Sequence, residues 1–267
     1  MRSFNYETKL WGVSRVTLSA FDLNSLKLKF TLEDLEKVSG QVLDVGCGGG
    51  GMAKGIKAYR HDINVFGIDI SKYAIKKAKR YSLGVDFQTG DVTKLDENYI
   101  NRFSAVVMYD VLEHLNNPGK VLANIFRILK KGGIFSLFVP LDGSLATIHG
   151  WARKFGFIPK LKYAGHAQQF KEKEVIDLLK RVGFKIEKKR NTQYLFSQIV
   201  DFAYFTFLYL RGKNIPYSIE TYLTYGKGFK RGFTLAVKSI ISLVSFVESL
   251  IFSPLPGLGL HLKAIKS

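Results

Sequence analysis

The chain has 267 residues, of which 46% are hydrophobic, so it is long and apolar enough to bury a substantial core. This composition excludes a disordered polypeptide, and the single cysteine, Cys47, excludes a disulfide framework and fits a reducing compartment. The formal net charge of +18 indicates either an anionic partner or a basic solvated surface, and charge alone does not distinguish them.

The positive charge is concentrated in the C-terminal part of the chain. Residues 1–150 contain 20 basic and 15 acidic side chains, whereas residues 151–267 contain 20 and 7. Nucleic acid, anionic lipid head groups or a phosphorylated substrate could meet this basic part, but no RNA-binding motif is present, so nucleic acid is the less favoured partner. The segment MRSFNYETKLWG lacks the apolar run of a secretory signal. We therefore expect a cytoplasmic protein, with attachment to the inner face of the membrane as an option.

Apolar residues at helical spacing predict a helix over 24–38, and an apolar strand over 41–45 follows it. Further strands are predicted over 64–70, 85–91, 104–110, 134–140, 185–196 and 257–266, and helices over 71–81, 118–133 and 171–184. The helix over 118–133 is expected to end at Lys130, Lys131 and a glycine pair. Strands that alternate with helices at this spacing predict an α/β fold with a doubly wound sheet.

The stretch between the last two predicted strands is unusually apolar. Residues 197–210 surround a single acidic residue, Asp201, and residues 233–252 are nearly long enough to cross a bilayer. A polar stripe runs along one face of the second segment at 4-3-4 spacing: Lys238, Ser242, Ser245 and Ser249. Glu248 lies beside this stripe. The pattern favours a helix that packs on the domain or lies in a membrane interface over one surrounded by lipid.

A glycine-rich turn, DVGCGGGG, follows the first predicted strand and opens a helix near Met52. Glycines let the backbone turn sharply and approach a ligand, and a helix N-terminus offers N–H groups to a carboxylate or phosphate. The pattern Gly46-x-Gly48-x-x-Gly51, with Asp69 about 20 residues further on, also satisfies the dinucleotide fingerprint. An NAD-dependent oxidoreductase therefore stays an alternative at this point.

The residues around the turn favour a different cofactor. The run VLDVGCGGG resembles the first motif of class I S-adenosylmethionine-dependent methyltransferases, FGIDIS resembles their second-strand motif, and TGDV resembles the third. Residues 103–140 resemble their fourth- and fifth-strand region, including the D-x-L-E-H element. These motifs stand in the family's order over residues 41–140. The resemblance implies a Rossmann-like, seven-stranded sheet whose last strand is antiparallel.

The resemblance also implies that S-adenosylmethionine is the cofactor. Asp69 would bind both ribose hydroxyls, Asp91 would accept from the adenine amino group, and Asp44 would lie near the methionine part, partly through water. Cys47 is interpreted as a small loop residue rather than a nucleophile. The predicted cofactor-binding residues are Asp44, Gly46, Cys47, Gly48, Gly50, Asp69, Ile70, Asp91, Val92, Tyr109 and Asp110.

Methyl transfer from a sulfonium is an in-line displacement, and an oxygen acceptor often needs a base near its proton. His166 lies in AGHAQQF, which resembles the H-x-x-x-F element of many small-molecule methyltransferases, and is the preferred base. His114 in LEHL is the second catalytic candidate, although a structural role fits it at least as well. Asp142 and His149 are weaker candidates for holding the acceptor. No H-x-x-H, C-x-x-C or clustered carboxylate pattern occurs, so no metal site is predicted.

Under this resemblance, residues 1–40 form a helical cap, 41–196 the methyltransferase core, 197–256 a hydrophobic and basic insertion, and 257–267 the final strand. The insertion and residues 140–170 leave the sheet at the edge that carries the cofactor. We therefore predict methyl transfer, with oxygen as the expected acceptor atom, to a small molecule, a lipid or a lipid-linked glycan. The alternative functions are a nucleic-acid methyltransferase and a non-catalytic relative. The alternative for the insertion is a hydrophobic lid or a dimer interface in a soluble enzyme.

Overall fold

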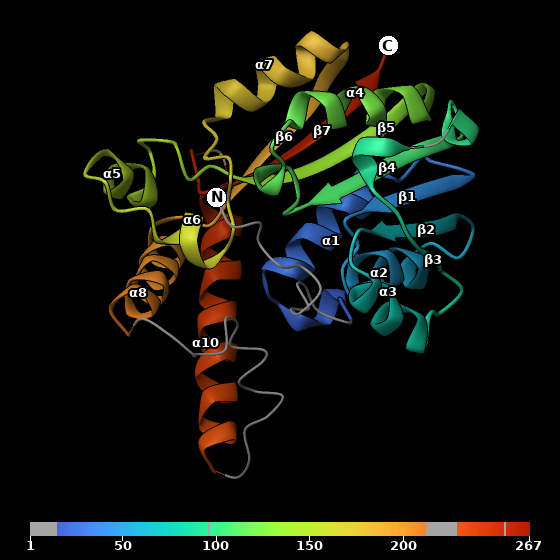
Figure 1. Cartoon of the computed structure of the whole chain (residues 1–267). Helices are drawn as coiled ribbons and strands as arrows, with labels where there is room; N and C mark the ends of the chain where they lie inside the picture. Colours follow the sequence, from blue (N-terminus) through green and yellow to red (C-terminus); the bar gives the residue numbers. More distant parts are fainter. Residues whose placement is uncertain (1–14, 96, 212–228, 254) are drawn as a thin grey trace.

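The computed structural model describes residues 15–95, 97–211, 229–253 and 255–267, and a seven-stranded sheet lies at its centre (Figure 1). The strands are β1 (Gln41–Val45), β2 (Asn64–Asp69), β3 (Asp86–Thr89), β4 (Phe103–Tyr109), β5 (Leu129–Pro140), β6 (Phe184–Thr192) and β7 (Gly259–Lys266). Their order is β3-β2-β1-β4-β5-β7-β6, and β7 runs antiparallel to both of its neighbours. The predicted mixed seven-stranded sheet is therefore confirmed.

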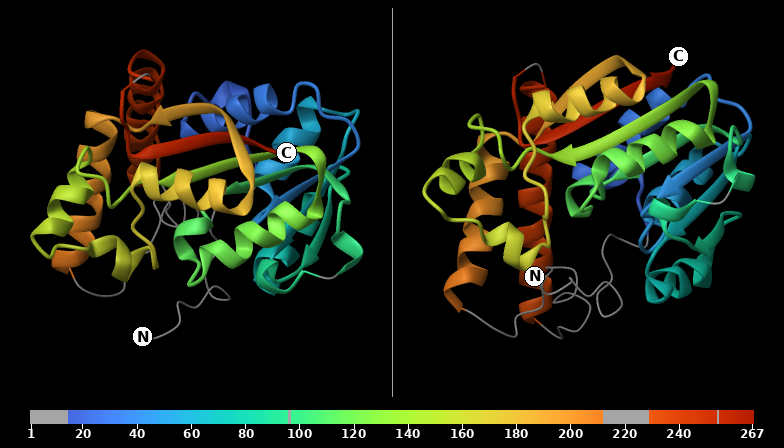
Figure 2. Two further views of the ribbon diagram at one scale, coloured as in Figure 1. Left: turned by 90° about the horizontal axis from the view of Figure 1, so that it is seen from above. Right: turned by 45° about the horizontal axis from the view of Figure 1, so that its top comes forward.

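Helices cover both faces of the sheet (Figure 2). They are α1 (Leu23–Asp34), α2 (Gly51–Tyr59), α3 (Lys72–Ala78), α4 (Pro118–Ile128), α5 (Ile148–Lys154), α6 (Pro159–Tyr163), α7 (Glu172–Val182), α8 (Leu195–Arg211) and α10 (Phe229–Ile251). Short 3-10 helices are η1 (Leu18–Ala20), η2 (Lys79–Tyr81), η3 (Val92–Lys94), η4 (Glu97–Tyr99) and η5 (Leu112–His114). One apolar core lies under α1, α2 and α3, and the other lies under α4 and α7. Because both faces are covered, β4 is buried along most of its length.

α4 shows how local sequence defines an element, and where tertiary pairing overrides it. The Asn117 side chain caps the helix by accepting a hydrogen bond from the Lys120 backbone, and Pro118 occupies the first turn. The helix ends at Ile128, so the predicted continuation through Lys130 and Lys131 is wrong. The next residue, Leu129, is buried and pairs with Phe103 of β4. Residues 129–133 therefore belong to β5, because this strand pairs with the sheet, although the sequence pattern had assigned them to the helix.

The predicted strand over 185–196 is also too long. β6 ends at Thr192, and Gln193 adopts a left-handed backbone conformation with φ of 60°. Glu248 of α10 then caps the start of α8, because its carboxylate accepts hydrogen bonds from the Tyr194, Phe196 and Ser197 backbones at 3.0, 2.6 and 3.2 Å. A carboxylate at a helix N-terminus satisfies unpaired N–H groups and complements the helix dipole.

The predicted polar stripe on α10 faces the domain in its second half. Ser245, Glu248 and Ser249 are buried, whereas apolar residues on the other side of the helix are exposed. The exposed ones are Leu235, Val237, Ile240, Leu243, Val244, Val247, Leu250 and Ile251. α10 projects away from the sheet (Figure 1). Within the described residues, no helix has both the length and the hydropathy to cross a membrane.

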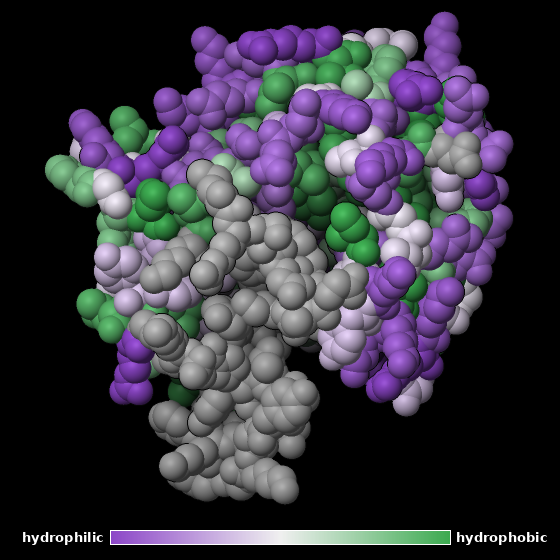
Figure 3. Space-filling model, in the orientation of Figure 1, coloured by the Kyte–Doolittle hydropathy of each residue, from purple (hydrophilic) through white to green (hydrophobic). Residues whose placement is uncertain are grey.

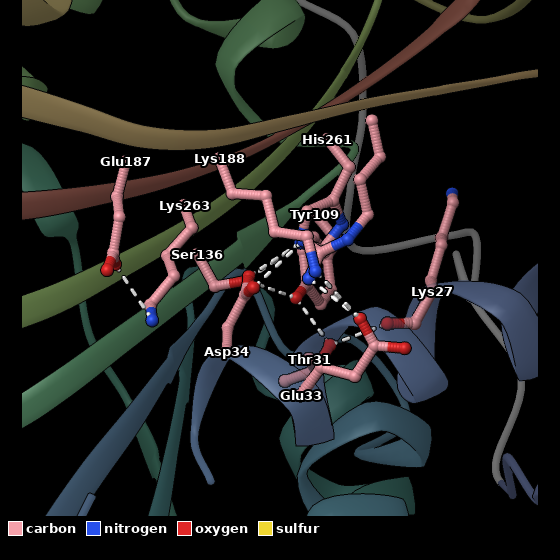
Figure 4. A network of polar contacts seen from close by, with 11 residues as sticks. Lys27, Thr31, Glu33, Asp34, Tyr109, Ser136, Glu187, Lys188, His261 and Lys263 are labelled. Carbon is pink, nitrogen blue, oxygen red and sulfur yellow. Dashed lines mark hydrogen bonds and ion pairs between the residues drawn. The ribbon is translucent and has the colours of Figure 1, made fainter. Parts of the chain in front are cut away.

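A buried polar network joins α1 to the sheet (Figure 4). The Asp34 carboxylate accepts hydrogen bonds from Ser136, His261 and Arg190, each at 2.8 Å. Burial alone would raise the pKa of Asp34, but the hydrogen bond and charge of His261, followed by the charge of Arg190, lower it. The network therefore anchors the residues before β1 to β5, β6 and β7, which come much later in the chain. The predicted boundaries of the cap stay a prediction, and residues 1–14 of it lie outside the described residues.

We expect Asp34→Ala to lower the free energy of unfolding by about 3–5 kcal/mol, because the buried Arg190 loses its buried partner and keeps only the exposed Glu33. Urea denaturation at pH 7 measures the difference. Glu33→Ala is the matched control: Glu33 is an exposed partner of Arg190, and its loss should cost at most about 1 kcal/mol. Since the pKa of Asp34 is depressed, its contribution should also fall as the pH drops below about 4. Equal losses in the two variants would contradict this account.

Candidate active site

A cavity of about 510 Å³ lies at the carboxyl edge of the sheet, where β1, β2 and β4 end. Its walls come from the turn after β1, from η3, η5 and α1, and from α6 and α8 on the opposite side. A second, more open hollow of about 850 Å³ faces α7 and contains none of the predicted site residues. The first cavity is therefore the candidate active site.

The glycine turn forms one wall of the cavity and packs closely against Val111. Gly46 has a φ of 71°, and a Cβ atom on it would lie 2.3 Å from a methyl group of Val111. The Gly46 and Cys47 backbones donate hydrogen bonds to the carbonyl of Ile68, and the Gly48 backbone donates to Asp69 at 2.8 Å. The turn is therefore held to the end of β2, and only glycine fits at position 46.

The structure brings ten of the eleven predicted cofactor-binding residues into the walls of this cavity. They are Asp44, Gly46, Cys47, Gly48, Asp69, Ile70, Asp91, Val92, Tyr109 and Asp110. The exception is Gly50, which packs behind the turn, where a Cβ atom would lie 2.5 Å from the Phe87 ring. A glycine is therefore needed at position 50 because the turn packs against Phe87, and not because a ligand approaches there. A glycine pattern in the sequence does not distinguish these two reasons.

Asp44 is a buried carboxyl group beneath the turn. It accepts one hydrogen bond, from the Ala53 backbone at 3.1 Å. Burial raises its pKa to about 7, and the nearby charge of Asp69 adds to that rise. Since a cation stabilises the charged form of a carboxyl group, Asp44 provides a site that favours a positively charged ligand.

Helix α1 adds residues to the cavity that the sequence did not reveal. Lys27 forms an ion pair with Asp110 at 2.5 Å, and its ammonium group lies 3.8 Å from the centre of the Phe138 ring. Tyr109 turns its hydroxyl away, toward Thr31 of α1 and Ser136 of β5. Nothing in the local sequence around Lys27 marks it as a site residue, because its ion-pair partner Asp110 lies 83 positions away in the chain.

The far end of the cavity contains three ionisable side chains: Glu113, His114 and His166. The two imidazole rings meet edge to face with centres 5.1 Å apart, and His114 Nδ1 lies 3.0 Å from the Gly165 carbonyl oxygen. Burial raises the pKa of Glu113 to about 8 and lowers the pKa of His114 to about 4. Neither carboxylate oxygen of Glu113 accepts a hydrogen bond from a described residue.

Among the described residues, these three side chains could also hold a metal ion, since one ligand atom from each lies within 4.8 Å of the others. The prediction of no metal site was based on motifs of closely spaced ligands. His166 is separated from Glu113 and His114 by about 50 residues, so no such motif exists for this group. Folding alone brings the three together.

A chain of buried charges continues outward from His166. His166 Nδ1 donates to Asp142 at 2.6 Å, and Asp142 also accepts from Lys160 at 3.0 Å. Lys160 forms a second ion pair with Asp201 of α8 at 2.7 Å, and Asp201 contacts His149 at 2.7 Å. Asp142 and His149, the weaker sequence candidates, therefore lie behind the cavity rather than in its wall. Lys160 and Asp201 do line the cavity and were not predicted.

A family model and the related sequences both identify this chain with methyltransferases. Residues 20–189 match the model of a family described as a methyltransferase domain. The chain is 34% identical over 116 residues to the ubiquinone biosynthesis O-methyltransferase of Dechloromonas aromatica (strain RCB), which corresponds to 42% of this chain and 49% of that protein. The chain thus spans about half the length of the curated relatives it matches first.

Solved structures share the fold at low sequence identity. The Haemonchus contortus phosphoethanolamine N-methyltransferase 2 in complex with S-adenosyl-L-methionine has a TM-score of 0.52 and 19% identity, with 89% of this chain and 52% of that chain covered. The [4+2]-cyclase SpnF has a TM-score of 0.56 and 18% identity, with 90% and 80% covered. Because one of these titles names a cyclase, the fold by itself does not determine the reaction.

Alanine substitutions at Gly46 and Gly132 test how closely the turn approaches Val111. Both glycines have the same left-handed backbone conformation, but only Gly46 has a close neighbour. Gly46 and Gly132 have φ values of 71° and 73°, but nothing lies within 4 Å of a Cβ atom built on Gly132. We expect Gly132→Ala to cost about 1–2 kcal/mol from backbone strain alone. Gly46→Ala should cost about 1–3 kcal/mol more, from the clash with Val111. Urea denaturation of both variants measures this difference, and similar losses would contradict the close approach.

Proposed function

This chain belongs to the methyltransferase-domain family, and from that premise we propose that it transfers a methyl group from S-adenosylmethionine to a hydroxyl oxygen of a small, lipid-like molecule. One observation carries the proposal: ten of the eleven predicted cofactor-binding residues share a cavity with His166, a buried imidazole that is oriented by a carboxylate. The curated relatives, which are named as O-methyltransferases, support oxygen as the acceptor atom and a small molecule as the substrate.

The cavity residues fit the cofactor. S-adenosylmethionine supplies an electrophilic methyl group on a cationic sulfur when it is bound. Asp69, at the end of β2, presents a carboxylate for the ribose hydroxyls, and Asp91, at the start of η3, presents one for the adenine amino group. The buried Asp44 carboxyl supplies the negative charge that a sulfonium and an amino group favour.

His166 is placed to accept the proton of the acceptor hydroxyl. Because its Nδ1 donates to Asp142, the lone pair of the neutral ring is on Nε2. With S-adenosylmethionine bound, the acceptor oxygen would take the methyl group, the electrons of the broken carbon–sulfur bond would stay on the departing sulfur, and His166 Nε2 would accept the hydroxyl proton. Burial would lower the pKa of His166, but the hydrogen bond and charge of Asp142 outweigh it and raise the pKa. The imidazole is therefore a stronger base than an unpaired buried histidine.

Calorimetry separates this cofactor from a dinucleotide. We expect the chain to bind S-adenosylhomocysteine and not NAD. Asp69→Ala should weaken the binding at least about tenfold, because hydrogen bonds to a charged group contribute about 1.5–3 kcal/mol. Asp86→Ala removes an exposed carboxylate at the opposite end of the neighbouring strand and should leave binding unchanged. Binding of NAD in place of S-adenosylhomocysteine would overturn the proposal.

The acceptor class and the base can be tested together. With a labelled methyl donor and a cell extract separated into lipid, glycan, RNA and small-molecule fractions, we expect label in the lipid fraction. His166→Asn should lower kcat about 10²–10⁴-fold while binding of S-adenosylhomocysteine persists. His61→Asn, at an exposed position near the amino edge of the sheet, is the matched control. Label confined to RNA, or full activity in His166→Asn, would contradict this assignment.

The insertion supports a location for the reaction: a cytoplasmic enzyme at the inner face of a membrane. Exposed apolar residues line α10, and Phe207, Tyr209 and Leu210 are exposed on α8. Figure 3 shows apolar side chains along the side of the molecule formed by α5 and α8, in contrast to the hydrophilic opposite side. The excess positive charge of the C-terminal part suits anionic head groups. Since α8 also lines the cavity, a docked surface would bring a lipid-like acceptor close to the site.

Flotation with anionic liposomes tests the membrane contact. The double variant Ile240→Glu with Ile251→Glu replaces two exposed apolar side chains of α10, so the fold should be preserved. We expect membrane binding to fall more than about tenfold, because each lost apolar side chain contributes about 1.5–3 kcal/mol when buried. Tyr81→Glu, at an exposed position after α3, is the control. Unchanged flotation of the double variant would favour a lid or a dimer interface instead.

A further inference from the structure

We propose that Lys160 and Asp201 are positioning residues for the Asp142–His166 pair, so that helix α8 of the insertion is part of the catalytic apparatus. The inference rests on the proposed methyl transfer, in which His166 accepts the proton. It assigns to the insertion a task inside the active site that is separate from any contact with a membrane.

The contacts form one continuous line from the segment after β5 to α8. His166 and Lys160 lie in the segment after β5, and both contact Asp142, at 2.6 and 3.0 Å. Lys160 also contacts Asp201 of α8 at 2.7 Å, so its ammonium group bridges two carboxylates. The imidazole is therefore connected to α8 through alternating charges, with no gap longer than a hydrogen bond.

The burial of this line argues for a role beyond stability. Asp142 and Lys160 are buried, with side-chain exposures of 4% and 8%, and Asp201 is one-quarter exposed at the cavity wall. Apolar residues of similar volume often stabilise a fold as well as a buried ion pair does. Here the charged line ends at an imidazole in the cavity wall, and Lys160, Asp201 and His166 all face the same cavity.

The charges around His166 predict opposite effects for the two residues. Burial and the Lys160 charge lower the pKa of His166, whereas the charges of Asp142 and Glu113 raise it. The other ionisable groups near this cluster are Asp110, His114, His149 and Asp201. Without Lys160, Asp142 would act on His166 unopposed and the pKa would rise. In Asp201→Asn, the positive charge of Lys160 would no longer be balanced by Asp201. It would then disfavour protonation of His166 more strongly, and the pKa of His166 would drop.

NMR titration of the full chain with ¹⁵N-labelled histidine measures the pKa of His166 directly, and His166→Asn identifies its signal. We expect Lys160→Met to raise this pKa by about one pH unit and Asp201→Asn to lower it by a smaller amount. Lys160→Arg keeps the positive charge and should restore a value close to that of the unmodified chain. The low-pH limb of the kcat profile should move in the same directions, since the base must be neutral to accept a proton.

Lys173→Met and Asp62→Asn are matched controls, because they remove exposed charges outside the cavity and should leave the His166 pKa unchanged. Circular dichroism establishes that each variant is folded. Absent shifts, or shifts in the same direction for Lys160→Met and Asp201→Asn, would overturn the positioning proposal. The titration needs no substrate, so it is independent of the proposed function. If the opposite shifts occur but His166→Asn keeps full kcat, the proposed base is wrong, and the positioning proposal falls with it.

Discussion

The close approach of the β1–α2 turn to Val111, two residues after the end of β4, is the constraint on which the site depends. Position 46 has to be glycine, because a Cβ atom there would overlap Val111. That approach holds the turn against Ile68 and lets the Gly48 backbone reach Asp69 at 2.8 Å. Asp44 is sealed beneath the same turn, where burial raises its pKa to about 7. The geometry of a single backbone segment thus creates both the shape and the charge of the cofactor half of the cavity.

The two halves of the cavity are built in different ways. The cofactor half comes from the ends of neighbouring parallel strands, so its residues follow short motifs in chain order. The acceptor half is assembled from η5, from the segment after β5 and from α8, which are far apart in the chain. The buried charges of the segment after β5 pair with one another and with Asp201 of α8.

Helix α10 shows how burial can reverse the usual arrangement of an amphipathic helix. Ser245, Glu248 and Ser249 are buried, and Glu248 and Ser249 accept hydrogen bonds from the backbone N–H groups that precede and begin α8. The apolar residues of the opposite side are left exposed. The helical period correctly predicted that a polar stripe exists, but a period does not say which face meets the domain.

The sequence by itself determined the α/β fold and the alternation of strands and helices, because these depend on local periodicity. It also pointed to ten residues of the cavity wall, through the resemblance of its short motifs to those of a known family. Only the tertiary structure decided that Gly50 packs behind the turn, that α4 yields residue 129 to the sheet, and that Lys27 and Asp201 reach the cavity. It also decided that Asp142, Lys160 and His166 share one chain of charges. Ion pairs and sheet pairing act across space, and a pattern along the chain carries no record of which distant residue will be the partner.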